Sequence, residues 1–319
     1  MKLLHKYYDG PFYTVYSMFG MRIRIIRRKM VKMANKCPVL KSQCMQAFGW
    51  HLENTGYAMD WENPKTLTEK MIWLWKYYYS RLPDFFTQIH DKEAFKDWVC
   101  ERIGEGYTVK LLGAWDSPHS ISWGELPDKF VLKSIHGGCG RETIIVENKF
   151  QLNIGRAIKQ MSRWNHGKGS RVIAEELLQD NDGGGLHDYK FFCFNGKPQF
   201  IMAFTRTKNT AKVEEKIENM YDTNWAVLPG YAYSYPSTPR GDISRPKNLE
   251  KMLKLAEKLS NGFPLIRVDM YSVGDKIYIG ELTQTPMGGL MCFDPIEYDR
   301  IYGDMLELPE KLSLPKSPL

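Results

Sequence analysis

The feature that most restricts how this chain can fold is a pair of strand-like segments near its C-terminal end. Residues 265–272 (Leu-Ile-Arg-Val-Asp-Met-Tyr-Ser) and 276–282 (Lys-Ile-Tyr-Ile-Gly-Glu-Leu) are rich in β-branched and aromatic residues, and Gly274-Asp275 separates them. This pattern predicts two antiparallel strands joined by a tight turn. Because successive side chains of a strand point to opposite faces, each strand places two polar side chains on one face. These pairs are Arg267 with Asp269 and Glu281 with Thr283.

If the two strands pair through this turn, both sets of polar side chains project into one cleft. Two carboxylates that face one site repel each other unless a cation lies between them. Carboxylate oxygens are hard ligands that suit a magnesium ion carrying nucleotide phosphates. Arg267 beside them would bind the charge that develops on a transferring phosphoryl group. The alternative interpretation is a surface salt bridge between Arg267 and the carboxylates.

A second candidate feature is a glycine-rich turn between two expected strands. Residues 129–133 and 143–146 are predicted strands, and Ser134-Ile-His-Gly-Gly-Cys-Gly-Arg141 connects them. Glycines expose backbone N–H groups to a polyphosphate, and Lys133 would add a point charge. The turn does not fit the P-loop pattern, and it does not fit a dinucleotide-binding fingerprint because a strand follows it. A hairpin without a ligand is the alternative.

The remaining pattern indicates an α+β layout of strand-rich modules interspersed with helices. Residues 171–178 are a predicted strand that ends in acids, followed by a polar, glycine-rich loop over 179–187 and then Asp188-Tyr-Lys190. A backbone hinge there can read an adenine edge, and an acid can accept hydrogen bonds from ribose hydroxyls. Another hairpin is expected over 189–205 around Asn195-Gly196. Helices are expected over 68–79, 91–99, 156–161 and 247–260.

Taken together and in this order, these motifs resemble the ATP-grasp superfamily. The segment from Arg267 is similar to the C-terminal part of D-alanine–D-alanine ligases, where an Arg-x-Asp strand precedes a Glu-x-Asn strand. More narrowly, the sequence resembles the TupA-like ATP-grasp family, named for teichuronopeptide synthesis, over about Asn63 to Pro309. The motifs that carry this resemblance are Asp91-Lys92, Phe130-Val-Leu-Lys-Ser-Ile-His-Gly-Gly138, Asp188-Tyr-Lys-Phe-Phe-Cys-Phe-Asn-Gly196, Arg267-Val-Asp269 and Gly280-Glu-Leu-Thr283.

The resemblance implies an ATP-grasp fold, in which two α+β subdomains hold ATP between them, and it implies roles for individual residues. Lys92 and Lys133 would hold phosphates, and residues 136–141 (His136, Gly137, Gly138, Cys139, Gly140 and Arg141) would form the phosphate loop. Glu175, Glu176 and Leu178 would contact adenine, and Asp188 with Lys190 would complete the nucleotide site. Arg267 and Lys133 would be catalytic, and Asp269, Glu281 and Thr283 would bind magnesium. Thr283 stands where most of the superfamily has Asn, which puts a second metal position in question.

The implied function is an ADP-forming carbon–nitrogen ligase that uses ATP and Mg²⁺. A carboxylate would attack the γ-phosphate, and an amine would then displace phosphate from the acyl phosphate. Relatives of this kind imply an amino acid and a uronic acid-bearing glycan or peptide as substrates, in capsule, cell-wall or O-antigen synthesis. Two other classes stay open: a glycosyltransferase of polysaccharide synthesis, and a nucleotide-binding protein without ligase activity. No nucleic-acid-binding motif is present.

The net charge of +7 belongs to the N-terminal segment. No acidic residue lies between Asp9 and Glu53, and without the eight basic residues there the chain carries 36 Lys and Arg against 37 acids. Apolar residues from Phe12 to Met33 recur at steps of three and four, which predicts a helix with a basic opposite face. This helix either lies on an anionic membrane surface or packs on its own catalytic domain, and nucleic-acid binding is a weaker third interpretation without a motif to support it.

The expected organisation is a basic helical segment over 1–62, a helical lead-in over 63–126, a small ATP-grasp subdomain over 127–178 and a large subdomain over 179–319. The six cysteines form no CxxC pair, which favours reduced thiols. The chain has no apolar run of membrane-spanning length and no signal-peptide pattern at Met1. We therefore expect a cytoplasmic protein, with contact at the inner membrane face as the consequence of the membrane interpretation.

Overall fold

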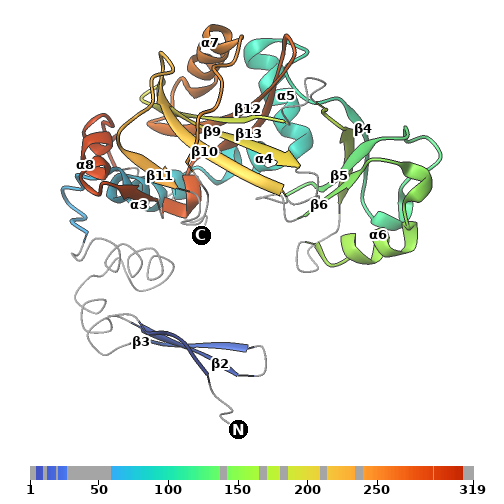
Figure 1. Ribbon diagram of the computed structural model, residues 1–319, viewed down its shortest axis with the longest axis horizontal. Helices are drawn as coiled ribbons and strands as arrows, with labels where there is room; N and C mark the ends of the chain where they lie inside the picture. The colour runs from blue at the N-terminus through green and yellow to red at the C-terminus, as the bar shows by residue number, and fades with distance from the viewer. Residues whose placement is uncertain are drawn as a thin grey trace, which may run out of the picture. The chain divides into compact units, whose positions relative to one another are not determined.

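A computed structural model of the chain describes residues 5–9, 13–18, 21–26, 59–136, 142–164, 171–179, 186–208, 214–233, 240–289 and 291–311. The chain divides into two compact units. The larger unit consists of Leu82–Leu228 and Ser237–Thr283, and the smaller consists of Met1–Arg81, Pro229–Pro236 and Gln284–Leu319. Both contain helices and antiparallel strands, as the α+β prediction requires (Figure 1).

A five-stranded antiparallel sheet forms the core of the larger unit, in the order β10-β9-β8-β12-β13. Its strands are β8 (Asp188–Phe194), β9 (Lys197–Lys208), β10 (Glu214–Asp222), β12 (Leu265–Val273) and β13 (Lys276–Thr283). The predicted turn at Asn195-Gly196 joins β8 to β9, and both residues have a positive φ, of 50° and 79°. A two-residue hairpin turn needs this left-handed backbone, which Asn and Gly adopt at low cost. Both predicted hairpins are therefore confirmed.

Helix α7 (Leu249–Ser260) packs on one face of this sheet, against β8, β9 and β12 (Figure 1). Its buried side chains include Met252, Leu255 and Leu259. Cys193 of β8 lies on the same face, with its Sγ 4.0 Å from the carbonyl oxygen of Ala256 in α7. Because side chains alternate along a strand, the neighbours of these apolar residues project from the opposite face. That opposite face carries the charged residues of β8, β12 and β13.

A four-stranded antiparallel sheet, in the order β4-β7-β5-β6, belongs to the same unit. Its strands are β4 (Leu111–Trp115), β5 (Phe130–Ser134), β6 (Thr143–Val146) and β7 (Val172–Glu176). Helix α6 (Ile154–Met161) covers one face, where its Ala157 and Met161 share a buried core with Phe130 and Leu132 (Figure 1). Strand β4 lies ahead of the expected subdomain boundary at residue 127, so this sheet begins earlier in the chain than the sequence indicated.

Two further helices of the larger unit are α4 (Pro83–His90) and α5 (Lys92–Ile103). Asp91 is the N-cap of α5, and its carboxylate accepts hydrogen bonds from the backbone N–H groups of Glu93 and Ala94 at 2.9 and 3.1 Å. Such a cap satisfies backbone donors that have no partner within the helix. The expected helix start at Asp91-Lys92 is confirmed, with Lys92 as the first residue of the helix. The larger unit also contains 3₁₀ turns over Pro118–Ser120 and Lys149–Gln151, and the smaller unit contains one over Tyr79–Arg81.

The smaller unit joins helix α3 (Leu67–Tyr77) to helix α8 (Glu297–Asp304). Thr66 and Glu69 form a capping box at the start of α3. The Asp299 carboxylate of α8 accepts a hydrogen bond from the backbone N–H of Thr68 at 2.9 Å. A two-stranded ladder of β11 (Tyr231–Tyr233) and β14 (Cys292–Asp294) completes it, and a 3₁₀ turn spans Pro286–Gly289.

The expected N-terminal helix is wrong where the structure describes it. Residues 5–26 contain β1 (His5–Asp9), β2 (Tyr13–Met18) and β3 (Met21–Ile26), paired as an antiparallel sheet in that order. The sequence Met21-Arg-Ile-Arg-Ile25 also alternates with a period of two, and β-branched Ile favours a strand. This local pattern prevails over the helical spacing. The expected segment continues to residue 62, but residues 27–58 of it lie outside the described residues. None of the described helices combines the length and apolar character that crossing a membrane requires.

Candidate active site

The four polar residues of the C-terminal hairpin meet through the register of three neighbouring strands. Asp269 of β12 pairs with Lys190 of β8 on one side and with Glu281 of β13 on the other. In the adjacent row, Arg267 pairs with Phe192 and Thr283. Directly opposed side chains on one face of a sheet lie within contact distance. The structure thus brings Arg267, Asp269, Glu281 and Thr283 together, as the alternation predicted.

Arg267 lies at the centre of this cluster and bonds to the other three. Its Nε and Nη2 donate to the two carboxylate oxygens of Asp269 at 2.6 and 2.7 Å. The same Nη2 donates to Glu281 Oε1 at 2.9 Å and to Thr283 Oγ1 at 3.0 Å. The guanidinium therefore supplies the cation that two converging carboxylates require. The fork of bonds to Asp269 also fixes its plane.

Burial distinguishes this cluster from the alternative of a surface salt bridge. Arg267 and Asp269 are 9% and 3% exposed, whereas the side chain of Glu281 is 51% exposed. Burial alone would lower the pKa of Arg267, but Asp269 and Glu281 hold that pKa above its ordinary value. Burial would likewise raise the pKa of Asp269, but Arg267 and Lys190 keep that pKa below its ordinary value. Both groups are charged, and the exposed side of the cluster is Glu281.

Lys190 extends the cluster from β8. Its Nζ lies 2.6 Å from Asp269 Oδ2 and 2.7 Å from Asp188 Oδ2. Burial would lower the pKa of Lys190, but these two carboxylates raise that pKa above its usual value. The other oxygen of Asp188, Oδ1, is buried and accepts no hydrogen bond from the described residues. An unused buried acceptor beside a charged cluster fits a donor from a ligand, such as a ribose hydroxyl.

A β-bulge re-aims the end of β13 at this cluster. Asp269 pairs with Glu281 and Met270 pairs with Ile279, which leaves Gly280 as the extra residue between them. A Cβ atom on Gly280 would lie 2.9 Å from Tyr271 Cε2 and 3.5 Å from the backbone oxygen of Asp269. Bulges of this kind often lie next to active sites, where they turn a side chain out of the regular pleat. Glycine is the residue that fits this bulge without pushing the Tyr271 ring.

A second charged cluster lies on the four-stranded sheet, on the face away from α6. Leu132 and Ala174 belong to the core under α6, so Lys133 and Glu175, which alternate with them, project to the other side. Lys133 Nζ lies 2.5 Å from Glu175 Oε2, and Lys96 Nζ from α5 lies 2.5 Å from Glu175 Oε1. Lys96 was not among the residues predicted for the site. Its spacing from Lys92 could have indicated it, because residues four apart in a helix share a face.

Lys92 adds a further cation beside Lys133. Its backbone N–H and its Nζ both donate to the carbonyl oxygen of Ile135, at 3.2 and 3.3 Å. Burial, and then the neighbouring ammonium of Lys133, lower the pKa of Lys92 to about 8, against the partial compensation of Glu281, Glu175 and Glu142. Clustered lysines that repel one another need an anion, and a polyphosphate is an anion of suitable charge.

The roles of the other residues predicted for nucleotide binding stay predictions. His136 is exposed just after β5, while Gly137, Gly138, Cys139, Gly140 and Arg141 lie outside the described residues. Glu176 ends β7 with its side chain half exposed, 3.9 Å from Lys110. Leu178 is half buried and follows β7. Because the carboxylate of Glu175 is engaged by two lysines, any adenine contact there falls to the backbone.

The cluster contains the types of side chain that bind a divalent cation. Asp269 and Glu281 offer carboxylate oxygens and Thr283 a hydroxyl, which are hard ligands that magnesium accepts. Within the described part of the chain, no group of three or more His, Cys, Asp or Glu side chains is arranged to hold a metal ion. Arg267 already bonds to all three of these side chains. The case for magnesium binding therefore depends on the type of their oxygen atoms and on the exposed carboxylate of Glu281.

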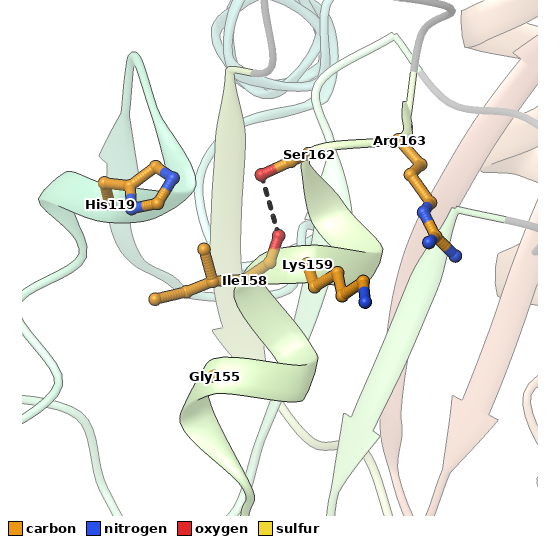
Figure 2. Close-up of a pocket in the computed structure, with 6 residues that line it drawn as sticks. All are labelled: His119, Gly155, Ile158, Lys159, Ser162 and Arg163. Carbon is orange, nitrogen blue, oxygen red and sulfur yellow. Dashed lines mark hydrogen bonds between the residues drawn. The ribbon is translucent and has the colours of Figure 1, made fainter.

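An open hollow of about 510 Å³ lies elsewhere in the larger unit, between the turn at His119 and helix α6 (Figure 2). Gly155, Ile158, Lys159, Ser162 and Arg163 of α6 and the residues after it line it. Figure 2 shows Ser162 donating to the carbonyl oxygen of Ile158, at 2.8 Å. Since α6 covers the face of the sheet opposite to Lys133 and Glu175, this hollow is separate from the charged clusters.

Comparison with known families decides between the folds that could carry two such clusters. The sequence profile of the TupA-like ATPgrasp family matches residues 69–307. The chain belongs to this family. The match covers every described residue of both clusters, and the chain therefore has the ATP-grasp fold of its family. Comparison with curated protein sequences gives no match.

Several solved structures are similar to this family member at low identity. The D-alanine–D-alanine ligase of Helicobacter pylori has 15% identity over 63% of this chain and 55% of its own, with a TM-score of 0.38. The D-alanyl-alanine synthetase A of Vibrio cholerae has 16% identity over 65% and 60%, with a TM-score of 0.43. The ATP-grasp ligase PsnB, with Mg and ADP, has 13% identity over 74% and 64%, with a TM-score of 0.42. This chain thus spans less than two thirds of the length of each.

Proposed function

We propose that this TupA-like ATPgrasp protein is an ATP- and magnesium-dependent ligase that joins a carboxylate to an amine through an acyl phosphate. The observation that carries the proposal is the position of Arg267, a buried cation held between Asp269 and the exposed Glu281. A fixed positive charge beside hard oxygen ligands suits the transfer of a phosphoryl group. Family membership supplies the ATP-grasp frame in which this chemistry would occur.

ATP would bind with its phosphates at the lysine cluster. Lys92 and Lys133 would contact phosphate oxygens, and the loop of residues 136–141 would close over them with its backbone N–H groups. The backbone after Glu175, through Glu176 to Leu178, would read the adenine edge. Asp188 would take a ribose hydroxyl on its unused Oδ1. Lys190 beside it would add charge towards the phosphates.

Magnesium would be held by Asp269, Glu281 and Thr283 and would neutralise charge on the ATP phosphates. In the first step, an oxygen of the substrate carboxylate attacks the γ-phosphorus, and ADP leaves. In the second step, the amine nitrogen attacks the acyl carbon, inorganic phosphate leaves, and the amine loses a proton to give the amide. Arg267 and Lys133 would stabilise the negative charge on the transferred group. Closure of the site would protect the acyl phosphate from water.

For the substrates, we propose an amino acid as the amine and a uronic acid-bearing glycan or a peptide as the carboxylate. This rests on the association of TupA-like proteins with surface polysaccharide synthesis. The work would take place in the cytoplasm, and the basic N-terminal segment would contact the anionic inner membrane face, where a lipid-linked glycan is available. Nucleic acid is not a proposed partner.

The products of ATP turnover distinguish this proposal from its alternatives. A ligase releases ADP and phosphate only when a carboxylate and an amine are both present. A glycosyltransferase would instead consume a sugar nucleotide, and Asp180-Asn181-Asp182, outside the described residues, has the Asp-x-Asp spacing that such enzymes use for a metal. Release of a nucleoside diphosphate from a sugar nucleotide without ATP would overturn the ligase proposal. Tight ATP binding without turnover in any substrate pair would support a binding protein.

A further inference from the structure

We propose that Lys96 is a positioning residue for nucleotide binding: through Glu175, it keeps the ammonium group of Lys133 in place and free to bind phosphate. The inference rests on the proposed function, because it concerns how the phosphate-binding lysine is prepared. Lys96 belongs to none of the motifs that suggested the site, and it would not touch the nucleotide itself.

The geometry assigns one oxygen of Glu175 to each lysine. Oε1 lies 2.5 Å from Lys96 Nζ, and Oε2 lies 2.5 Å from Lys133 Nζ. Lys96 is the more buried of the two, with 15% of its side chain exposed against 31% for Lys133. Of the two lysines, Lys133 is therefore the one that reaches solvent, and Lys96 is the one that holds the carboxylate of Glu175 on its buried side.

Lys96 is itself fixed at a second point. Its Nζ donates to the carbonyl oxygen of Val109 at 2.6 Å, just ahead of β4. A long flexible side chain that is held by two acceptors has few other positions to adopt, so it can hold its partner. Helix α5, the segment at Val109 and strand β7 are thereby joined at one ammonium group. Such a link defines where Glu175 points, and Glu175 then defines where Lys133 points.

Charge gives Lys96 a second effect on Lys133. The Glu175 side chain is only 6% exposed, so it needs a compensating cation. Without Lys96, Lys133 would be the single partner of a buried carboxylate and would be neutralised by it. With Lys96 present, two ammonium groups share the one negative charge of Glu175, which leaves positive charge on Lys133 for a polyphosphate. Lys96 thus frees Lys133 to attract phosphate oxygens without approaching them.

A neighbouring lysine–glutamate pair provides a matched control. Lys110 lies 3.9 Å from Glu176, the residue after Glu175, and the two side chains are 70% and 50% exposed. Exposed pairs of this kind contribute little to stability or to binding. Lys96→Met and Lys110→Met remove the same charge from adjacent places and retain a similar apolar stem. A general effect of net charge on ATP binding would appear in both variants.

The test measures the dissociation constants of ATP, ADP and AMP in the presence of Mg²⁺ by calorimetry, on the full chain and its variants. We expect Lys96→Met to weaken ATP and ADP binding about tenfold and AMP binding about twofold at most, because the effect passes through the phosphates held by Lys133. Lys110→Met should match the native chain. In a Lys133→Met background the Lys96→Met change should lose most of its effect, since the residue it acts through is gone.

Each outcome decides the proposal. Native-like ATP binding by folded Lys96→Met, an equal loss for all three nucleotides, or additive effects with Lys133→Met would overturn it. If Lys96→Met does not fold, Lys96→Gln replaces it, and failure of both while Lys110→Met folds would make Lys96 a purely structural residue. A native chain that binds no ATP would overturn the proposed function itself, an outcome distinct from unchanged binding by the variant.

Discussion

Arg267 and Asp269 form two parallel hydrogen bonds, of 2.6 and 2.7 Å, between side chains two residues apart on one strand. Both side chains are buried, and Lys190 also bonds to Asp269, so two buried cations share this carboxylate. Glu281 completes the cluster from the neighbouring strand with half of its side chain in solvent. The two acids that we propose as magnesium ligands therefore differ in what they do for the fold, and variants can separate the two roles.

Asp269→Asn should abolish turnover and also destabilise the protein by about 3–5 kcal/mol, because it removes the buried carboxylate that Arg267 and Lys190 share and leaves each of these buried cations with one acid, Glu281 or Asp188. Glu281→Gln should abolish turnover but change the free energy of unfolding by less than about 1 kcal/mol, because Glu281 is half exposed. Urea unfolding at pH 7.5, together with ADP release, measures both quantities. Equal stability losses in the two variants, or near-native ADP release from either, would contradict this assignment.

The pH dependence of ATP binding should report Lys92, whose pKa is lowered to about 8. Below that pH the ammonium is charged and attracts phosphate, so ATP affinity should fall as the pH rises from 7 to 9.5. The unfolded chain keeps the ordinary pKa of 10.5, so it binds more protons than the folded chain between about 8 and 10.5. The contribution of Lys92 to stability therefore increases with pH across that window.

Lys92→Met should flatten the alkaline fall in ATP affinity, because the group that titrates there is removed. Calorimetric titrations at pH 7.0, 8.0 and 9.0 measure it, and Lys110→Met is the matched control. An unchanged pH profile in Lys92→Met would assign the titration to another group.

Lys133→Ala should weaken ATP binding and lower turnover, since it removes a point charge from the phosphates. Cys139→Ser should be tolerated, because the glycine-rich loop would act through its backbone N–H groups and serine keeps the backbone unchanged. Steady-state kinetics with varied ATP separates the two variants. A comparable loss from both would make the Cys139 thiol a chemical participant.

Much of this fold could be predicted because local chemistry and tertiary structure agree. Asn195-Gly196 supplies the left-handed turn that β8 and β9 need, and the alternation around Arg267 sets which side chains share a face. Strand β10 was missed because Glu214–Asp222 is rich in charge; at the edge of a sheet, charges on a strand oppose unwanted pairing. The N-terminal strands were mistaken for a helix because apolar residues at steps of two and of three or four coexist there.

The candidate site was predictable in its residue types but not in its partners. Nothing in the sequence around Lys133 indicates that its ammonium meets Glu175, which lies 42 residues further along the chain. The contact depends on the antiparallel register of β5 and β7, and Lys96 joins it only because α5 packs beside them. Such long-range pairings follow from how elements pack, whereas the hairpin of β12 and β13 follows from one turn.

Association with anionic lipid should depend on the basic N-terminal segment. Replacing Arg27, Arg28, Lys29 and Lys32 with Gln should reduce binding to vesicles that contain phosphatidylglycerol, since each basic residue near an anionic surface contributes about 1 kcal/mol. Four lysines on and just before helix α7 (Lys247, Lys251, Lys254 and Lys258) provide a control set for the same replacement. Co-sedimentation at low and high salt measures it. Supernatant recovery of the native protein at low salt would show that the segment serves its own fold.

Trapping the acyl phosphate with hydroxylamine tests the central claim most directly. Hydroxylamine replaces the unknown amine, so only the carboxylate needs to be found, from a panel of glucuronic acid, galacturonic acid and glutamate peptides. The ligase account predicts a hydroxamate with one ADP and one phosphate for each product formed, and no product without Mg²⁺. Two results would contradict it. One is the formation of AMP and pyrophosphate from ATP. The other is ADP release that no carboxylate stimulates and that is accompanied by no hydroxamate.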